Sequence, residues 1–158
     1  MGLEIERKFL LASDAWRDEV LRSERMVQGY LAESPACSVR VRVAGERADL
    51  NLKGITIGAS RSEFEYPVPL ADGRYMLDHY CGERTVEKVR HYLDVDGRCW
   101  EIDEFLGRNA GLVVAEIELE SEDAEFARPT WLGREVTGDE RYYNLMLADR
   151  PYGSWQDG

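Results

Sequence analysis

Charged and apolar residues alternate near the start of the chain. Residues 2–11 read Gly-Leu-Glu-Ile-Glu-Arg-Lys-Phe-Leu-Leu. This pattern predicts a β-strand, because successive side chains of a strand point to opposite faces. Glu4, Glu6 and Lys8 would then share one face of the strand, and Ile5 would lie on the other face.

The same alternation recurs along the chain and predicts seven further strands. They span residues 26–31, 38–43, 48–53, 61–66, 85–95, 99–105 and 112–120. Turn residues separate the strands, and Asp96-Gly97 is a strong hairpin signal. Helices are expected over residues 15–21, 70–80, 122–127 (or a turn there) and 139–150. This succession indicates an α+β protein built on an antiparallel sheet.

The domain organisation follows from the absence of a linker, a repeat or a low-complexity segment. We expect a single domain over residues 1–150 and a loose C-terminal tail over residues 151–158. An eight-stranded antiparallel β-barrel with a few peripheral helices fits the predicted elements.

The sign of the charges bears on which strand face is inside. Individual strands carry one sign, as in Arg-Val-Arg at 40–42, Glu-Phe-Glu at 63–65, Lys-Val-Arg at 88–90 and Glu-Ile-Glu at 116–118. An ordinary barrel would have an apolar interior, and its outer face would more usually mix signs. We therefore expect the inverse, a tunnel with a charged lumen. Its apolar outer faces would need cover from helices or from a partner subunit in a homodimer.

The composition narrows the choice of partners. The chain has 158 residues, with 20 Lys and Arg against 31 Asp and Glu, and a formal net charge of −11. So acidic a protein has no general field that attracts nucleic acid or anionic lipid, and we expect neither as a partner. We see no membrane-length apolar run and no signal segment, so a cytoplasmic protein is expected. Three cysteines without a Cys-x-x-Cys pair indicate free thiols.

The first strand carries candidate chemistry. Glu4 and Glu6 would stand about 7 Å apart on one face, with Lys8 next in line. Two neighbouring carboxylates favour a hard cation, and an ammonium group favours an anion. A metal-bound phosphate would satisfy both requirements. A solvated edge strand with a charged face is the alternative.

These motifs resemble those of the CYTH superfamily, the triphosphate tunnel metalloenzymes, and the size is similar to that of its short bacterial tripolyphosphatases. The matching stretches run along nearly the whole chain: Glu4-Ile-Glu6-Arg-Lys8, Gln28-Gly29-Tyr30-Leu31, Arg40-Val-Arg42, Leu52-Lys53, Glu63-Phe-Glu65, Glu87-Lys88-Val-Arg90, Glu101-Ile-Asp103, Glu116-Ile-Glu118 and Thr137-Gly-Asp139-Glu-Arg141-Tyr142-Tyr-Asn144. The resemblance implies an eight-stranded tunnel that binds triphosphate inside.

The resemblance also implies roles for individual residues. The divalent-metal ligands would be Glu4, Glu6, Glu116 and Glu118. The phosphate clamp would be Lys8, Arg40, Arg42, Lys53, Lys88 and Arg90. Glu63 and Glu65 match further acidic tunnel residues, which could hold a second metal or a water. Asp103 and Arg141 are weaker matches, to the metal ligands and to the phosphate clamp respectively. Tyr143 stands where short bacterial members often have a lysine.

The expected activity is metal-dependent hydrolysis of inorganic tripolyphosphate to pyrophosphate and phosphate, with Mg²⁺ or Mn²⁺ as cofactor. Lys88 could position or deprotonate the attacking water. Rivals on the same scaffold are a class IV-type adenylate cyclase and a thiamine or nucleoside triphosphatase. A non-catalytic polyphosphate-binding module is a rival of another class. The last helix, as in the family, could plug one end of the tunnel.

Overall fold

The computed structural model describes residues 2–155, and a closed sheet forms its centre. The nine strands are β1 (Gly2–Leu11), β2 (Arg22–Glu33), β3 (Cys37–Ala44), β4 (Arg47–Gly54), β5 (Ser60–Val68), β6 (Thr85–Val95), β7 (Arg98–Phe105), β8 (Val113–Glu118) and β9 (Leu132–Glu135). The two α-helices are α1 (Leu70–His79) and α2 (Asn144–Asp149). Short 3₁₀ turns are η1 (Ala15–Glu19), η2 (Gly107–Asn109), η3 (Glu140–Tyr142) and η4 (Tyr152–Ser154).

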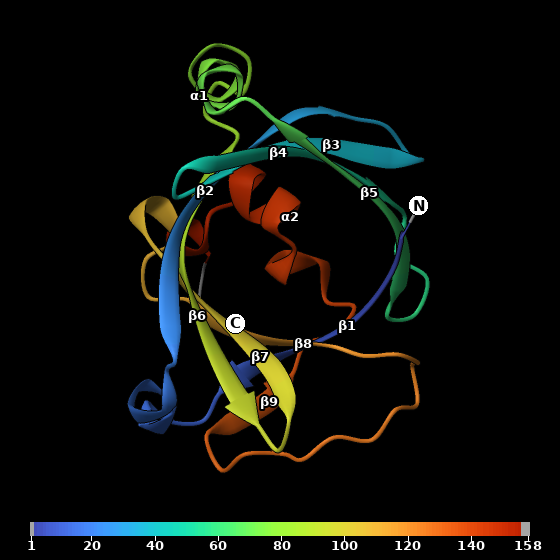
Figure 1. Cartoon of the computed structure of the whole chain (residues 1–158), viewed down its shortest axis with the longest axis vertical. Helices are drawn as coiled ribbons and strands as arrows, with labels where there is room; N and C mark the ends of the chain where they lie inside the picture. Colours follow the sequence, from blue (N-terminus) through green and yellow to red (C-terminus); the bar gives the residue numbers. More distant parts are fainter. Residues whose placement is uncertain (1, 156–158) are drawn as a thin grey trace.

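Eight of these strands close into an antiparallel barrel, as the sequence predicted. The order is β5-β4-β3-β2-β6-β7-β8-β1, and pairing of β1 with β5 closes the ring. The ninth strand, β9, adds to the end of β1. Figure 1 shows the ring of strands with α2 inside it and α1 outside, against β3 and β4. The division into one domain over residues 1–150 stays a prediction.

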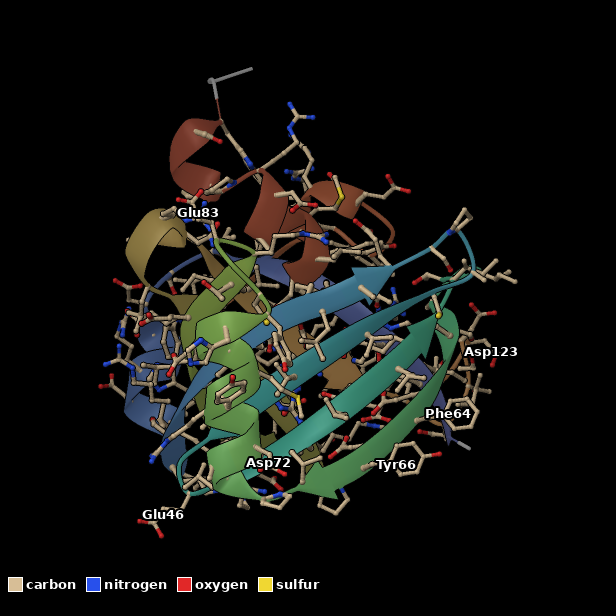
Figure 2. The ribbon with its side chains drawn as sticks, turned by 90° about the horizontal axis from the view of Figure 1, so that it is seen from above. Glu46, Phe64, Tyr66, Asp72, Glu83 and Asp123 are labelled. Atoms are coloured by element: carbon tan, nitrogen blue, oxygen red, sulfur yellow. The ribbon has the colours of Figure 1, made fainter. Side chains whose placement is uncertain are left out.

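The charged side chains face the bore, which confirms the expected orientation. Arg40, Lys88 and Glu116 are 7, 1 and 5% exposed, although they lie on different strands. The opposite face of β5 carries Phe64 and Tyr66, whose rings project outward from the strand in Figure 2. Alternation therefore places charge inside and apolar groups outside.

Segments of the chain cover much of the apolar outer surface. Phe9, Trp100 and Ile117 pack outside the barrel against Trp16 of η1 and Trp131 before β9. At one end of the bore the packing is apolar instead. There α2 packs against residues of β2, β6, β7 and β8: Tyr30, Val86, Phe105 and Val114.

The helix α1 approaches the barrel closely at Gly73. A Cβ atom built there would lie 2.5 Å from the Ala48 side chain, so glycine permits the contact. Leu3 and Tyr66 remain 65 and 54% exposed. The homodimer expected from the apolar faces stays a prediction. Neither α-helix of residues 2–155 has the length and apolar character to span a bilayer.

Several local predictions were wrong. Residues 15–21 form only the 3₁₀ turn η1, and residues 139–150 divide into η3 and α2. Over residues 122–127, where a helix or a turn was expected, the chain forms a turn at residues 122–123. Strand β9 was not predicted. Part of the expected loose tail folds back: the Trp155 ring lies 5.3 Å from the Tyr142 ring. Residues 156–158 lie outside the described part of the chain.

Candidate active site in the barrel bore

Glu4 of β1 lies between two cations contributed by β4 and β5. Its carboxylate accepts hydrogen bonds from Lys53 at 3.1 Å and from Arg61 at 2.8 Å. Burial disfavours its ionised form, but Lys53 and Arg61 outweigh burial and hold the pKa of Glu4 well below its usual range. Glu63 lies 3.7 Å from Lys53, and its hydrogen bond with Glu4, with burial, raises the pKa of Glu63 to about 7.

A second cluster of charges lies where β1 pairs with β8. The register sets Glu6 opposite Glu118 and Lys8 opposite Glu116. The Lys8 ammonium lies 3.4 Å from Glu116 and 3.9 Å from Glu6. Burial, followed by the charge of Glu116, raises the pKa of Glu6 to about 8. Burial and the charge of Glu116 therefore both oppose ionisation of Glu6.

Asp103 of β7 connects two buried cations of β6. It accepts from Lys88 at 2.7 Å and from Arg90 at 2.8 and 2.9 Å. Burial, together with the Arg90 charge, lowers the pKa of Lys88 to about 8, although Asp103 opposes this. Asp103 therefore interacts with cations rather than with the acids of β1 and β8.

The last helix reaches this cluster from inside the ring. Asn144, the first residue of α2, accepts a hydrogen bond from Lys88 at 3.0 Å and another from Gln28 at 2.9 Å. Figure 1 shows α2 within the barrel. The chain just before α2 also contacts Lys8, which donates to the Tyr142 carbonyl at 3.5 Å and lies 5.4 Å from the Tyr143 ring centre.

Arg40 of β3 differs from the other bore cations because its partner is neutral. Its guanidinium donates twice to the Asn51 side-chain oxygen, at 3.0 and 2.8 Å. Arg42, two residues on, lies 3.7 Å from Asp49 and 4.0 Å from Glu65. Arg40 is therefore available to a bound anion, whereas Arg42 already has carboxylates beside it.

Two cavities adjoin these charges. One, of about 290 Å³, opens beside α2. Its charged lining includes Glu4, Glu6, Lys8, Arg40, Lys53 and Arg61. The other, also of about 290 Å³, is lined by four acids: Glu4, Glu63, Glu65 and Glu118. The first cavity combines cations and carboxylates, which a metal-bound polyphosphate requires.

The structure gathers most of the candidate residues, with one clear exception. Arg141 is exposed in η3, pairs with Asp139 at 2.7 Å and lines neither cavity. The acids of β1 and β8 are not arranged as a preformed metal site. Residues 2–155 contain no group of three or more acidic, His or Cys side chains arranged to hold a metal. Their cationic neighbours account for this, because each ammonium or guanidinium draws a carboxylate toward itself.

Some residues of the bore were missing from the predicted site. Arg61 begins the strand predicted over residues 61–66 but was not assigned to the clamp, and it bonds Glu4 across the β1–β5 closure. Asn51, Gln28 and Asn144 were not assigned roles because neutral amides give no charge signal. For Asn51 the available clue was its place between Asp49 and Lys53 on one face of β4.

Comparison with known proteins agrees with this architecture. A family model described as the CYTH domain matches residues 2–147. An inorganic triphosphatase of Acetivibrio thermocellus is 43% identical over 99% of this chain and 100% of its own length. An inorganic triphosphatase of Nitrosomonas europaea is 38% identical over 92% of this chain and 96% of its own. The crystal structure of an inorganic triphosphatase matches with a TM-score of 0.68, 36% identity, and coverage of 92 and 97%.

Proposed function

The chain belongs to the CYTH domain family, and from this premise we propose that it hydrolyses inorganic tripolyphosphate to pyrophosphate and phosphate inside the bore. One observation carries the proposal. Arg40 is 7% exposed, yet among residues 2–155 it forms no ion pair with a carboxylate. A buried guanidinium without a counter-charge is costly, so a bound anion would stabilise it.

Four cations of the proposed clamp line the first cavity: Lys8, Arg40, Lys53 and Arg61. Arg40 and Arg42 would hold phosphoryl oxygens, because a guanidinium binds two oxygens of one group in a fixed geometry. Lys8 and Lys53 would add point charges. We add Arg61 to the clamp because its hydrogen bond to Glu4 places it beside them. Binding at several oxygens would fix the triphosphate relative to the attacking water.

The acids fit a divalent cation, Mg²⁺ or Mn²⁺, by their donor chemistry. Glu4, Glu6, Glu116 and Glu118 offer the oxygen ligands that such ions prefer. The raised pKa of Glu6, about 8, reflects burial and repulsion from Glu116, and a cation would relieve that repulsion. When bound, the ion would neutralise charge that develops on the phosphoryl oxygens. Glu63 and Glu65 would supply the second cavity with further oxygen donors.

Lys88 is the group that we propose acts on the attacking water. Its pKa of about 8 leaves a useful fraction neutral near physiological pH. Asp103 and Asn144 hold the ammonium nitrogen at 2.7 and 3.0 Å, so we assign Asp103 to positioning Lys88 and Arg90 rather than to the metal. Arg141, which pairs with Asp139 and lines neither cavity, has no role in this proposal.

Phosphate release from tripolyphosphate, measured beside ATP and thiamine triphosphate with and without chelator, tests the proposal. Metal-dependent turnover of tripolyphosphate that exceeds turnover of the other two is expected. Preference for ATP with release of cyclic nucleotide would favour a cyclase, and tight binding without turnover would favour a polyphosphate-binding module.

The acids can be tested in the same assay. Replacement by glutamine preserves shape and removes charge, so Glu4→Gln and Glu116→Gln should abolish the metal-dependent rate. Retained wild-type turnover in either variant would contradict the assignment of that residue as a metal ligand.

A further inference from the structure

The cations of the bore divide into two classes by their partners. Most lie 2.7 to 3.7 Å from a carboxylate oxygen. These are Lys8, Arg42, Lys53, Arg61, Lys88 and Arg90. Arg40 bonds instead to the neutral amide of Asn51. The positive charge of Arg40 is therefore not compensated by a neighbouring carboxylate.

The position of Asn51 lowers the stability of the folded protein. Its side chain is fully buried, at 0% exposure, and its Oδ1 accepts both Arg40 hydrogen bonds. Its Nδ2 has no hydrogen-bond partner among residues 2–155. An unsatisfied buried amide donor destabilises a folded protein. The residue at this position therefore serves something other than packing.

The alternatives at position 51 make the role of the amide clear. An aspartate could accept the same two hydrogen bonds, but it would neutralise Arg40 as Asp103 partly neutralises Arg90. A leucine would leave the guanidinium without an acceptor. Asparagine orients the guanidinium and adds no charge.

The surroundings of Arg40 favour an anion as the missing partner. Arg40 lines the cavity beside α2, and so does Lys53, two residues from Asn51 on β4. Burial, with repulsion from neighbouring arginines, lowers the pKa of Arg40. On the other side of Asn51, the register places Glu65 of β5, with which Asn51 forms no hydrogen bond.

We infer that Asn51 is a positioning residue that aims Arg40 at the bound triphosphate while leaving the guanidinium charge uncompensated. The inference rests on the proposed function and deepens it. Asn51 acts through Arg40 and makes no contact with the reacting atoms. The neutral amide of Asn51 therefore affects the affinity for the triphosphate and not the rate of the chemical step.

Three measurements on the full chain test the inference: thermal unfolding, isothermal titration with tripolyphosphate in chelator, and steady-state kinetics with Mg²⁺. Asn51→Asp should raise KM by about tenfold or more, because a charge-assisted contact to phosphate is lost. Its kcat should stay within about threefold, since the chemistry is untouched. Its melting temperature should equal or exceed that of the wild type, because Arg40 gains an ion pair.

Two further variants separate positioning from general damage. Asn51→Thr keeps a neutral acceptor, so its KM should stay within about threefold of the wild type. Ala71→Asp adds the same charge in the exposed first turn of α1, outside the barrel, and should leave KM unchanged. In an Arg40→Gln background, Asn51→Asp should raise KM little further, because the residue through which it acts is gone.

The outcomes are distinguishable from failure of the proposed function. If the wild-type chain neither binds nor hydrolyses tripolyphosphate, both proposals fall. If the wild type does both, a KM for Asn51→Asp within about twofold of it would overturn the inference alone. An undiminished effect of Asn51→Asp on KM in the Arg40→Gln background would also overturn it. The same holds if Asn51→Asp lowers stability and affinity together.

Discussion

Removal of the Asp103 charge should destabilise the barrel far more than removal of a comparable surface charge. Asp103 is 0% exposed and accepts three hydrogen bonds from Lys88 and Arg90 at 2.7 to 2.9 Å. Asp103→Asn keeps the shape but leaves two buried cations facing an amide. Breaking a buried pair in this way costs about 3–5 kcal/mol. For a chain of this size, about 2–4 °C per kcal/mol gives a fall in Tm of about 6–20 °C.

The pH dependence gives the same prediction a second check. Asp103 raises the pKa of Lys88, so in the variant that pKa falls below its wild-type value of about 8. The unfolded lysine has a pKa of about 10.4, and stability rises with pH wherever the unfolded chain binds more protons. The variant therefore begins to regain stability at a lower pH than the wild type. The difference in Tm should shrink as pH rises from about 6 to about 8.

Glu87→Gln is the matched control, because Glu87 precedes Lys88 on the same strand. It pairs with Arg25 at 2.7 Å, the same distance as Lys88 to Asp103, but the two side chains are 44 and 66% exposed. An exposed pair contributes about 1 kcal/mol or less. Thermal unfolding of both variants by circular dichroism compares them. A loss for Asp103→Asn no greater than that for Glu87→Gln would refute the reasoning.

Further predictions concern turnover. Because burial lowers the pKa of Lys88 to about 8, kcat/KM for tripolyphosphate should rise with pH up to about 8 and stay constant above it. Lys88→Met should remove this rise. A pH profile unchanged by the substitution would contradict the role of Lys88. Arg141→Ala should leave kcat/KM within about twofold, since Arg141 is exposed, pairs with Asp139 and lines neither cavity. A larger loss would place it in the site. Asn144→Leu should lower kcat more than KM rises, because it removes the acceptor that Lys88 and Gln28 share; single-turnover phosphate release checks this.

The barrel and its charged interior could be predicted from the sequence because both depend on a period of two. Arg40 and Arg42 face one way on β3, and the valines between and around them face the other. That local pattern survives folding, since a strand fixes the direction of every side chain. The single sign of pairs such as Arg40 and Arg42 then indicated which face was inside.

The elements that were missed carry weaker local signals. Strand β9 spans only Leu132–Glu135, and its residues Leu-Gly-Arg-Glu do not alternate. The expected last helix divides because Tyr143 adopts an extended backbone between η3 and α2. The segment around Trp155 was expected to be loose because it is rich in polar and turn-forming residues, yet the Trp155 ring packs 5.0 Å from that of Tyr152. These outcomes depend on tertiary contacts.

Pairing within the site required the register of the closed sheet. Asp103 was grouped with the metal ligands only as a weaker match to the family's pattern. In the sheet it lies directly opposite Arg90, which determines its partner. Arg61 and Glu4 are likewise opposite each other, but only because β1 and β5 close the barrel across 57 residues of sequence. A linear pattern of charge contains the residue types but not these neighbours.

The pairing of charges in the bore explains why a metal and a polyphosphate belong together in the proposed reaction. Glu4 lies 3.1 Å from Lys53 and 2.8 Å from Arg61, and Glu116 lies 3.4 Å from Lys8. A metal ion alone would separate the acids from these cations, and a triphosphate alone would leave the acids unpaired; either loss costs several kcal/mol. If both bind as proposed, the cations would gain phosphoryl oxygens as the acids gain the metal. Each binding event would then favour the other, and we expect the bore to bind the complex in preference to either free ion.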